Sequence, residues 1–378
     1  MQANSRPKVL LLIPHLGGGG AERVTALLAR GLSAEKYELH LGLITQSQAA
    51  VEEIPSWVHV HALGARRVRG GAFRLLRLVR QLKPELILSG MFHLNFLVLL
   101  LRLFFPPNTR VMVRQNGTVS SVLAFGGLPC YIRLLYRLLY RHADRVICQT
   151  QSMVDDIAHE LRIEENRLAV LPNPVDVEEI RCSTRLHSAS QTTSCSNTGP
   201  LLLALGRLSP EKGFDLLLRA FASVQKEFPK ASLLIAGTGP EEATLRVLCR
   251  ALALDSAVRF AEPIDRPWTL FPATTLFVLP SRHEGMPNAL LEAAAGGLPI
   301  AALPASGGIV DLLRALPGVW LASEISAEAL AASLLSALRA LRPGERFDHP
   351  FVEAFRFDRA IGAYEKLIDR VLERSTDA

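Results

Sequence analysis

Two cations stand five residues apart in the segment GRLSPEKG, residues 206–213. Arg207 can make forked contacts with a phosphate, whereas Lys212 acts as a point charge. On a loop bounded by glycine and proline, such a pair can grip a diphosphate from two sides and stabilise the charge that grows as it leaves. Both side chains could equally be solvated surface charges, so the spacing alone leaves the two interpretations open.

A second segment, SRHEGMPNALLEA, covers residues 281–293 and combines carboxylates with a predicted helix start. Pro287 suits the first turn of a helix, so the backbone N–H groups of residues 285–289 are expected to point toward an anion. Glu284 then lies in the loop before the helix, and Glu292 lies about two turns inside it. Two glutamates at this spacing often occur by chance, but here they follow a predicted strand.

Four consecutive glycines, residues 17–20, separate the first predicted strand from its helix. Glycines there let the backbone approach a phosphate or carboxylate at the helix N-terminus. The segment lacks the G-x-G-x-x-G form and a clear acidic ribose ligand about 20 residues on, which disfavours a dinucleotide site and a nicotinamide-dependent dehydrogenase. A purely structural glycine turn is the alternative.

One histidine stands just past a predicted strand, His93 in the segment SGMFHLN. There it could donate a hydrogen bond to a sugar hydroxyl or stabilise charge, although a lone histidine is more often structural. His283 is interpreted as part of the loop structure. Since no His, Cys and carboxylate cluster has metal-ligand spacing and no Ser-His-Asp order stands out, we expect no metal and no cofactor.

Short apolar runs alternate with amphipathic segments, and this happens twice along the chain. Such alternation predicts βαβ units with a parallel sheet, and therefore an α/β fold of two doubly wound, Rossmann-like domains that face a central cleft. The predicted strands are residues 8–13, 39–45, 86–89, 145–149, 201–205, 232–236 and 276–279, and the predicted helices are residues 21–32, 214–227 and 288–295.

The domain boundaries follow from composition. Residues 182–199 are dominated by Ser, Thr and Asn without apolar periodicity, which indicates a linker or surface loop. Residues 357–372 read as an amphipathic helix. We therefore expect an N-terminal domain at residues 1–178, a second domain at 179–355, and a C-terminal helical segment at 356–378.

Length and composition exclude several classes of protein. The 378 residues have room for two domains, and 49% hydrophobic and 21% charged residues do not fit a disordered chain. The five scattered cysteines indicate neither a disulfide framework nor a zinc site, and they favour a reducing, cytoplasmic compartment. No segment reads as a secretory signal or a membrane span, because the apolar runs are too short.

The excess positive charge is N-terminal. Residues 1–180 hold 21 Lys and Arg against 15 Asp and Glu, and residues 181–378 hold 21 of each. Within residues 60–145 the contrast is 14 against 2, which predicts a basic surface for an anionic partner.

The basic residues of this surface recur at helical spacing. They are Arg74, Arg77 and Arg80 among leucines, and Arg133, Arg137 and Arg141 among leucines and the aromatic residues Tyr136 and Tyr140. The pattern favours helices that lie on an anionic membrane, with aliphatic and aromatic side chains turned toward the lipid. No nucleic-acid motif is present. The alternative is a pair of core-packed helices with solvated arginines.

Taken in order, five segments resemble glycosyltransferase family 4. They are GGGGAERV, PNPVD at residues 172–176, GRLSPEKG, AGTGPEE at residues 236–242 and SRHEGMPNALLEA. The resemblance covers about residues 8–340. It implies a retaining enzyme of the GT-B fold that uses a nucleotide sugar. In that fold the C-terminal helix, here in residues 356–378, returns to the N-terminal domain.

The resemblance also implies roles for individual residues. Arg207 and Lys212 match the pair that binds the diphosphate, Glu292 matches the carboxylate on the ribose, and Glu284 matches the residue beside the transferred sugar. The backbone of Gly285, Met286, Pro287 and Asn288 would hold the sugar and phosphate. Gly239 would flank the base, Gly18 and Gly19 would close on the phosphates, and His93 matches the histidine of the F-H-x-N segment.

Two departures concern only the acceptor. Relatives often carry a histidine where this chain has Ser89-Gly90, and a His-Asn pair where it has Gln115-Asn116-Gly117. The donor motifs are intact. We expect a hexosyl- or N-acetylhexosaminyl-transferase that moves a sugar from a nucleoside diphosphate, with UDP preferred from the family, to a saccharide on polyprenyl diphosphate.

With such an acceptor, we expect the protein on the cytoplasmic, inner face of the cell membrane, where polysaccharide or glycan precursors are assembled. The alternatives are a transferase with a soluble acceptor and a non-catalytic GT-B scaffold that binds glycan at a membrane.

Overall fold

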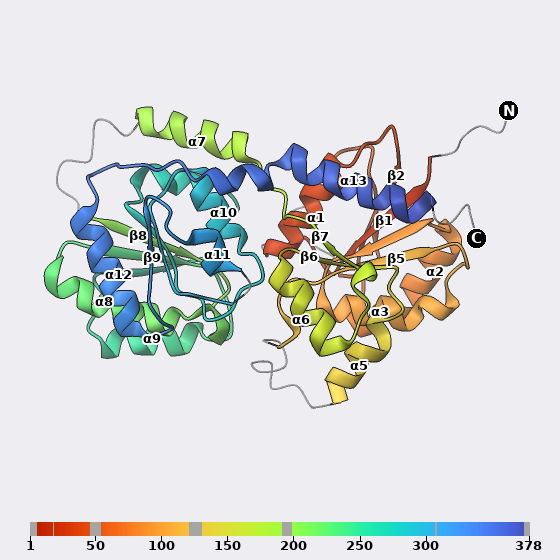
Figure 1. The fold of residues 1–378 in the computed structure, drawn as a ribbon, viewed down its shortest axis with the longest axis horizontal. Helices are drawn as coiled ribbons and strands as arrows, with labels where there is room; N and C mark the ends of the chain where they lie inside the picture. Colours follow the sequence, from red (N-terminus) through yellow and green to blue (C-terminus); the bar gives the residue numbers. More distant parts are fainter. Residues whose placement is uncertain are drawn as a thin grey trace. The chain divides into compact units, whose positions relative to one another are not determined.

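A computed structural model describes residues 6–17, 19–45, 54–120, 131–190, 199–306 and 308–373. The chain divides into two compact units (Figure 1). Unit 1 comprises Met1–Pro174 and Phe357–Ala378, and unit 2 comprises Val175–Arg356. The first boundary therefore lies four residues before the predicted one, and the second lies one residue after it.

Unit 1 contains a seven-stranded parallel sheet in the order β3-β2-β1-β4-β5-β6-β7. Its apolar runs form the central strands because both faces of the sheet are covered. The strands are β1 Lys8–Ile13, β2 Glu38–Leu43, β3 His59–Ala62, β4 Leu86–Ser89, β5 Arg110–Arg114, β6 Arg145–Cys148 and β7 Leu168–Val170.

Helices cover both faces of this sheet. Val9, Leu11 and Ile13 of β1 pack with α1 and α13, whereas Leu10 and Leu12 pack on the opposite face, toward α2, α3, α5 and α6 (Figure 1). The elements are α1 Gly20–Gly31, η1 Val68–Gly71, α2 Ala72–Leu82, α3 Phe92–Leu101, η2 Arg102–Phe104, α5 Tyr131–Tyr140, α6 Gln151–Leu161, η3 Glu165–Arg167 and α13 Phe357–Glu373.

Unit 2 repeats the plan with a six-stranded parallel sheet in the order β10-β9-β8-β11-β12-β13. Its strands are β8 Leu201–Leu205, β9 Ser232–Ala236, β10 Val258–Ala261, β11 Leu276–Leu279, β12 Ile300–Ala302 and β13 Val319–Leu321. The covering elements are α7 Val177–Ser190, η4 Pro210–Lys212, α8 Phe214–Glu227, α9 Glu242–Ala251, η5 Pro267–Ala273, α10 Asn288–Ala295, α11 Ile309–Leu313, α12 Ala327–Ala340 and η6 Pro350–Phe355.

Both units are therefore Rossmann-like α/β domains, as predicted. In each sheet the strand order reverses beside the first strand, between β1 and β4 in unit 1 and between β8 and β11 in unit 2. Ligands of doubly wound sheets bind outside the carboxyl ends of the strands at such a point. The loops that follow β1, β4, β8 and β11 are the places where each unit can form a site.

The prediction of a linker or loop at residues 182–199 was wrong for its first half. Helix α7 continues through Ser190, and residues 191–198 lie outside the described part of the chain. Val177 and Ile180 are buried against unit 2, and the Thr184 hydroxyl donates to the Ile180 carbonyl at 2.8 Å. The polar composition hid this helix because only its first turns carry an apolar stripe.

The prediction that the tyrosines of α5 face lipid was also wrong. Tyr136 and Tyr140 are fully buried, and both rings pack with Phe96 of α3. The outward side of α5 carries Leu134 and Leu138 instead. Within the described residues, none of the helices has both the length and the apolar content needed to cross a bilayer.

Candidate functional site

The carboxyl end of the unit 2 sheet brings Lys212 and Glu284 together, although they are far apart in sequence. The Lys212 ammonium donates to Oε1 and Oε2 of Glu284 at 2.7 and 2.8 Å. Ser281 also donates its hydroxyl to Oε1 of Glu284 at 2.6 Å. The glutamate is buried, and these three hydrogen bonds give both of its oxygens partners and fix its position.

A second ion pair joins the same two segments, the one that follows β8 and the loop that follows β11. Arg282 donates through Nη1 and Nη2 to the carboxylate of Asp215 at 2.6 and 2.7 Å, and Nη1 also donates to the Pro210 carbonyl at 2.9 Å. Burial alone would raise the pKa of Asp215, but the Arg282 guanidinium outweighs it and lowers the pKa below its ordinary value. The loop after β11 is thereby held against the start of α8.

The loops approach so closely that only glycine fits. Gly213 has a φ of +66°, and a Cβ there would lie 2.0 Å from the Pro280 carbonyl oxygen. Gly239 lies against the preceding loop, where a Cβ would come within 2.2 Å of the Leu208 carbonyl oxygen. The Glu241 N–H donates to that same oxygen at 2.9 Å. The predicted base-flanking Gly239 thus packs against the Arg207–Lys212 loop because bare backbone is required there.

Helix α10 supplies the third side of this arrangement. It begins at Asn288 with Pro287 as the preceding cap, and no side chain caps its first N–H groups. Gly285, Met286 and Pro287 are buried, while Asn288 is half-buried. Glu292 lies buried on the helix. An uncapped helix N-terminus next to a cationic loop is suited to an anion.

Arg207 stands apart from these contacts. Its side chain is exposed, and it makes no hydrogen bond or ion pair with any residue that the structure describes. Unlike Lys212, this guanidinium has its donors open to a ligand. In the predicted diphosphate-binding pair, the Lys212 ammonium is thus held by Glu284, whereas the Arg207 guanidinium is exposed on the same loop.

The predicted residues of unit 1 lie at the carboxyl end of its own sheet. His93 is exposed in the first turn of α3, directly after β4, with its ring 4.8 Å from that of Phe92. Gly19 caps α1 after β1, and Gly18 lies outside the described residues.

Two family models match the chain in sequence. The first, described as Glycosyltransferase Family 4, matches residues 18–179, and the second, described as Glycosyl transferases group 1, matches residues 190–347. They follow the two units closely. This chain is a glycosyltransferase with a Glycosyltransferase Family 4 domain and a Glycosyl transferases group 1 domain.

Two relatives of this glycosyltransferase are named as transferases of the same kind. An uncharacterized glycosyltransferase of Methanocaldococcus jannaschii is 25% identical over 64% of this chain, and the match spans 61% of that relative's length. A Campylobacter jejuni protein named N-acetylgalactosamine-N,N'-diacetylbacillosaminyl-diphospho-undecaprenol 4-alpha-N-acetylgalactosaminyltransferase is 26% identical, covering 76% of this chain and 78% of that protein.

Solved structures of the GT-B fold superpose on almost the whole chain. Anabaena HepE, in complex with UDP and glucose, matches with a TM-score of 0.79 at 15% identity, covering 96% of this chain and 100% of HepE. At this identity the match shows the fold, and it confirms the predicted architecture for this glycosyltransferase.

Sequence reasoning missed the residues that position the site. Arg282 and Asp215 were given no role, although they clamp the loops that carry Lys212 and Glu284. In unit 1 the Asn116 side chain donates to the Gly90 carbonyl at 2.6 Å, and buried Arg114 donates to Asn173. Their only sequence signal was polarity at strand ends, which does not reveal partners that are distant along the chain.

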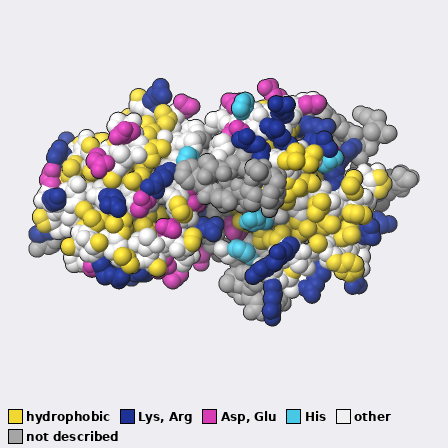
Figure 2. Space-filling view, turned by 90° about the horizontal axis from the view of Figure 1, so that it is seen from below, with side chains coloured by type: hydrophobic (Ala, Val, Ile, Leu, Met, Phe, Trp, Pro, Cys, Tyr) yellow, Lys and Arg dark blue, Asp and Glu magenta, His cyan; other side chains and the backbone are white. Residues whose placement is uncertain are grey.

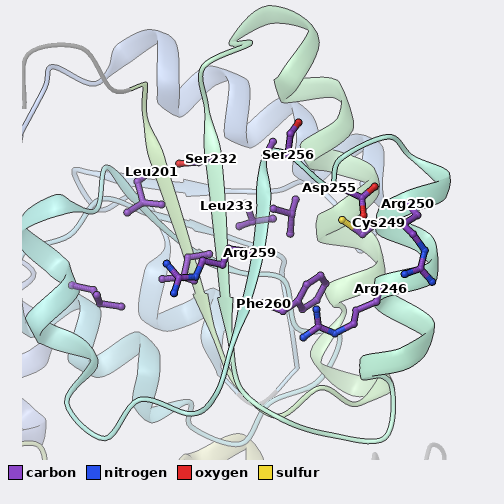
Figure 3. A pocket seen from close by; sticks show the side chains of 14 residues that line it. Leu201, Ser232, Leu233, Arg246, Cys249, Arg250, Asp255, Ser256, Arg259 and Phe260 are labelled. Carbon is purple, nitrogen blue, oxygen red and sulfur yellow. The ribbon is translucent and has the colours of Figure 1, made fainter.

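Unit 2 also contains a cavity that lies away from this site. It measures about 730 Å³ and opens around the amino-terminal ends of β8, β9 and β10, where Leu201, Ser232 and Asp255 line it (Figure 3). The motifs predicted to bind the donor follow the carboxyl ends of β8, β9 and β11. This cavity therefore lies at the opposite end of the sheet from the predicted site.

Proposed function

We propose that this glycosyltransferase moves a hexosyl or N-acetylhexosaminyl group, with retention at the anomeric carbon, from a UDP-sugar to a saccharide carried on polyprenyl diphosphate. The observation that carries the proposal is the loop of residues 206–213, which presents an open Arg207 beside Lys212 and is fixed against Glu284. Cationic groups fixed where a diphosphate departs are the main requirement of such a reaction.

In this proposal each donor residue has one task. Arg207, Lys212 and the N-terminus of α10 neutralise the diphosphate, so that no metal is needed for that purpose. Glu292 accepts hydrogen bonds from the ribose, and Gly239 lets the base approach the backbone. The backbone from Gly285 to Asn288 contacts the sugar and the phosphate next to it.

The environment of Glu284 favours a positioning role for this carboxylate. Both of its oxygens already accept hydrogen bonds from Lys212, and Oε1 also accepts one from Ser281. A carboxylate engaged in this way is a poor nucleophile, so a double displacement through Glu284 is disfavoured. The acceptor hydroxyl instead bonds to the anomeric carbon as the bond to the diphosphate breaks, and its proton passes to the departing diphosphate.

Two relatives support the identity of the substrates. HepE is a solved complex with UDP and glucose, and the Campylobacter jejuni relative is named for an acceptor on diphospho-undecaprenol. On the acceptor side, His93 follows β4 with an exposed ring that could donate a hydrogen bond to a sugar hydroxyl. We assign it that role.

Unit 1 has a surface suited to the lipid part of the acceptor. Phe73 of α2 and Leu103 of η2 are 77% and 85% exposed, and Leu134 of α5 is exposed as well. Figure 2 shows hydrophobic side chains gathered on the face that carries these helices, with Lys and Arg around them. Such a mixture favours peripheral binding to the anionic inner face of a cell membrane.

A transfer assay tests the proposal. UDP-hexoses and UDP-N-acetylhexosamines are offered with a polyprenyl-diphosphate-linked N-acetylhexosamine in detergent, and with the same saccharide free in solution. We expect one UDP-sugar to react, with the lipid-linked acceptor preferred and an α-configured product from an α-linked donor by NMR. Equal use of the free saccharide would overturn the acceptor assignment, and an inverted product would overturn retention.

The matched control for this assay compares the substitution of two lysines of unit 2. Lys212→Ala removes the lysine of the site, whereas Lys226→Ala removes an exposed lysine of α8. Loss of transfer in the first variant alone supports catalysis at this loop. If no UDP-sugar reacts with any acceptor, a non-catalytic scaffold replaces the enzyme.

A further inference from the structure

Unit 1 contains a cavity whose charged lining is entirely cationic. It measures about 610 Å³ and is lined by Gly64, Ala65, Arg66, Arg67, Arg69, Gly70 and Arg74. No carboxylate belongs to this lining, and the sequence has no Asp or Glu between residues 54 and 84. Four guanidinium groups around one space, without a counter-charge in the lining, attract an anion.

The arginines of this cavity divide into two kinds. Arg74 donates through Nη1 to the carbonyls of Leu63 and Gly64 at 2.6 and 2.7 Å, and therefore shapes the loop. The side chains of Arg66, Arg67 and Arg69 are exposed and make no hydrogen bond or ion pair with any described residue. These three guanidinium groups have their donors open to a ligand.

The cavity lies at the end of the sheet that faces ligands. Its loop follows β3, and the Ala65 N–H donates to the carbonyl of Ile44, just past β2, at 2.8 Å. Since the sheet is parallel, β4 ends on this same side of it, and α3 follows with His93 in its first turn. Three strand spacings separate β3 from β4, roughly 14 Å, which a short oligosaccharide can bridge.

We infer that this arginine cavity binds the diphosphate of the lipid-linked acceptor, while the saccharide extends toward His93. The inference rests on the proposed function and adds a subsite to it. Arginine forks suit a diphosphate because each can make paired hydrogen bonds with phosphate oxygens. Phe73 is 77% exposed and immediately precedes Arg74, so the cavity has an apolar neighbour for the polyprenyl chain.

The anionic headgroup of a bilayer lipid shares the same phosphate chemistry, so the experiment must separate the two sources. Titration calorimetry of the full chain uses geranyl diphosphate as a soluble probe, with inorganic pyrophosphate beside it. Flotation with vesicles of phosphatidylcholine and phosphatidylglycerol measures headgroup binding. The variant is Arg66→Gln/Arg69→Gln, because Arg74 is needed for the loop. The matched control, Arg30→Gln/Arg141→Gln, removes the same charge from exposed sites of unit 1.

We expect the cavity variant to bind geranyl diphosphate at least about tenfold more weakly, because two charge-assisted contacts are lost, while the control binds as the wild type does. Pyrophosphate should bind more weakly than geranyl diphosphate and show the same dependence. Unchanged binding, equal loss in the control, or loss of vesicle binding alone would overturn the inference.

Two further measurements keep the test decisive. If circular dichroism shows that the first variant is unfolded, Arg67→Gln/Arg69→Gln takes its place with the same expectation. UDP is titrated into every variant, and its affinity should not change. Failure of the wild type to bind UDP would count against the proposed function, whereas failure to bind geranyl diphosphate would count against the cavity.

Discussion

The two units share a fold but use their charges in opposite ways. Unit 1 carries 25 Lys and Arg against 17 Asp and Glu, a net charge of +8, whereas unit 2 carries 17 against 19, a net charge of −2. At the ligand end of unit 2, Lys212 pairs with Glu284 and Arg282 pairs with Asp215. At the corresponding end of unit 1, the cavity arginines Arg66, Arg67 and Arg69 have no such partner among the described residues.

The difference teaches what each charge is for. Paired charges in unit 2 fix two loops against each other, whereas Arg207, on the same loop as Lys212, has no such partner among the described residues. Arg66, Arg67 and Arg69 of unit 1 are exposed and make no such contacts with described residues, which suits a flexible anionic chain or a membrane. In the proposed function, the paired charges of unit 2 would place the reacting atom of the donor accurately, and the exposed arginines of unit 1 would bind a long lipid-linked acceptor.

The largest expected effect comes from breaking the Lys212–Glu284 pair. Lys212→Ala leaves a buried carboxylate with one fewer charged partner, and should lower kcat/KM by about 10²- to 10³-fold and the free energy of unfolding by about 3 kcal/mol. Steady-state kinetics and urea unfolding measure the two effects. The double variant Lys212→Ala/Glu284→Gln should recover part of the stability but none of the activity. Wild-type values for the single variant would refute the role of the pair.

The next effect tests the close approach of the unit 2 loops. Gly213→Ala and Gly344→Ala both place a Cβ on a backbone with positive φ, but only the first meets another atom, the Pro280 oxygen at 2.0 Å. Gly344→Ala should lower the free energy of unfolding by about 1 kcal/mol, and Gly213→Ala by about 3 kcal/mol or more, with weaker UDP binding. Equal losses in the two variants would mean that the approach is unimportant.

These contacts mark the limit of what the sequence could predict. The bounds of β1, β4, β8, β9 and β11, and of α8 and α10, match the predicted ranges, because each is an apolar run or stripe and most of their ends carry a proline, a glycine or a polar residue. The ion pairs could not be predicted, since they depend on which loops the strand order brings together. Lys212 meets Glu284 only because β8 and β11 are neighbours at the switch point.

The predictions for β3 and α5 failed for identifiable reasons. Strand β3 is missing from the prediction because its sequence, HVHA, is half-exposed at the sheet edge and has no apolar run. In α5 the arginines and tyrosines recur with the same period, so periodicity could not decide which set faces inward. Aromatic partners on α3 decide it, and they bury Tyr136 and Tyr140.

A smaller effect is expected in the pH dependence of stability at the β2 and β3 edge of the unit 1 sheet. Burial lowers the pKa of His40, whose Nδ1 lies 3.0 Å from His61 Nε2 and whose Nε2 lies 3.0 Å from Glu38 Oε1. Burial likewise lowers the pKa of His61. The unfolded chain therefore takes up protons at a higher pH than the folded one. Stability is complete above the unfolded pKa of about 6.5 and falls as the pH drops below it, by at most about 1.4 kcal/mol per pH unit for one group.

Hydrogen exchange of the β2 and β3 amides at pH 7.5 and 5.5 measures this loss locally. His40→Gln should make the protection less dependent on pH, whereas His159→Gln, at an exposed position of α6, should not. If both variants respond to pH as the wild type does, the imidazoles of this edge do not set the acid sensitivity of unit 1.

The smallest effect concerns the outward apolar side chains. Leu103→Ser should weaken flotation with anionic vesicles about three- to tenfold, because one exposed leucine is worth about 1 kcal/mol when it reaches lipid, with stability almost unchanged. Val247→Ser changes an exposed apolar residue of unit 2 and should leave flotation as it is. Equal effects of the two substitutions would mean that unit 1 has no special role in vesicle binding.

Nucleotide calorimetry tests the central claim, that unit 2 holds the donor, most directly. UDP, GDP and ADP are titrated into the wild type, Arg207→Ala, Glu292→Ala and Arg66→Gln/Arg69→Gln. We predict that UDP binds, that both unit 2 substitutions weaken it about tenfold or more, and that the unit 1 variant binds it as the wild type does. UDP binding that ignores Arg207 and Glu292, or that depends on Arg66 and Arg69, would contradict the account.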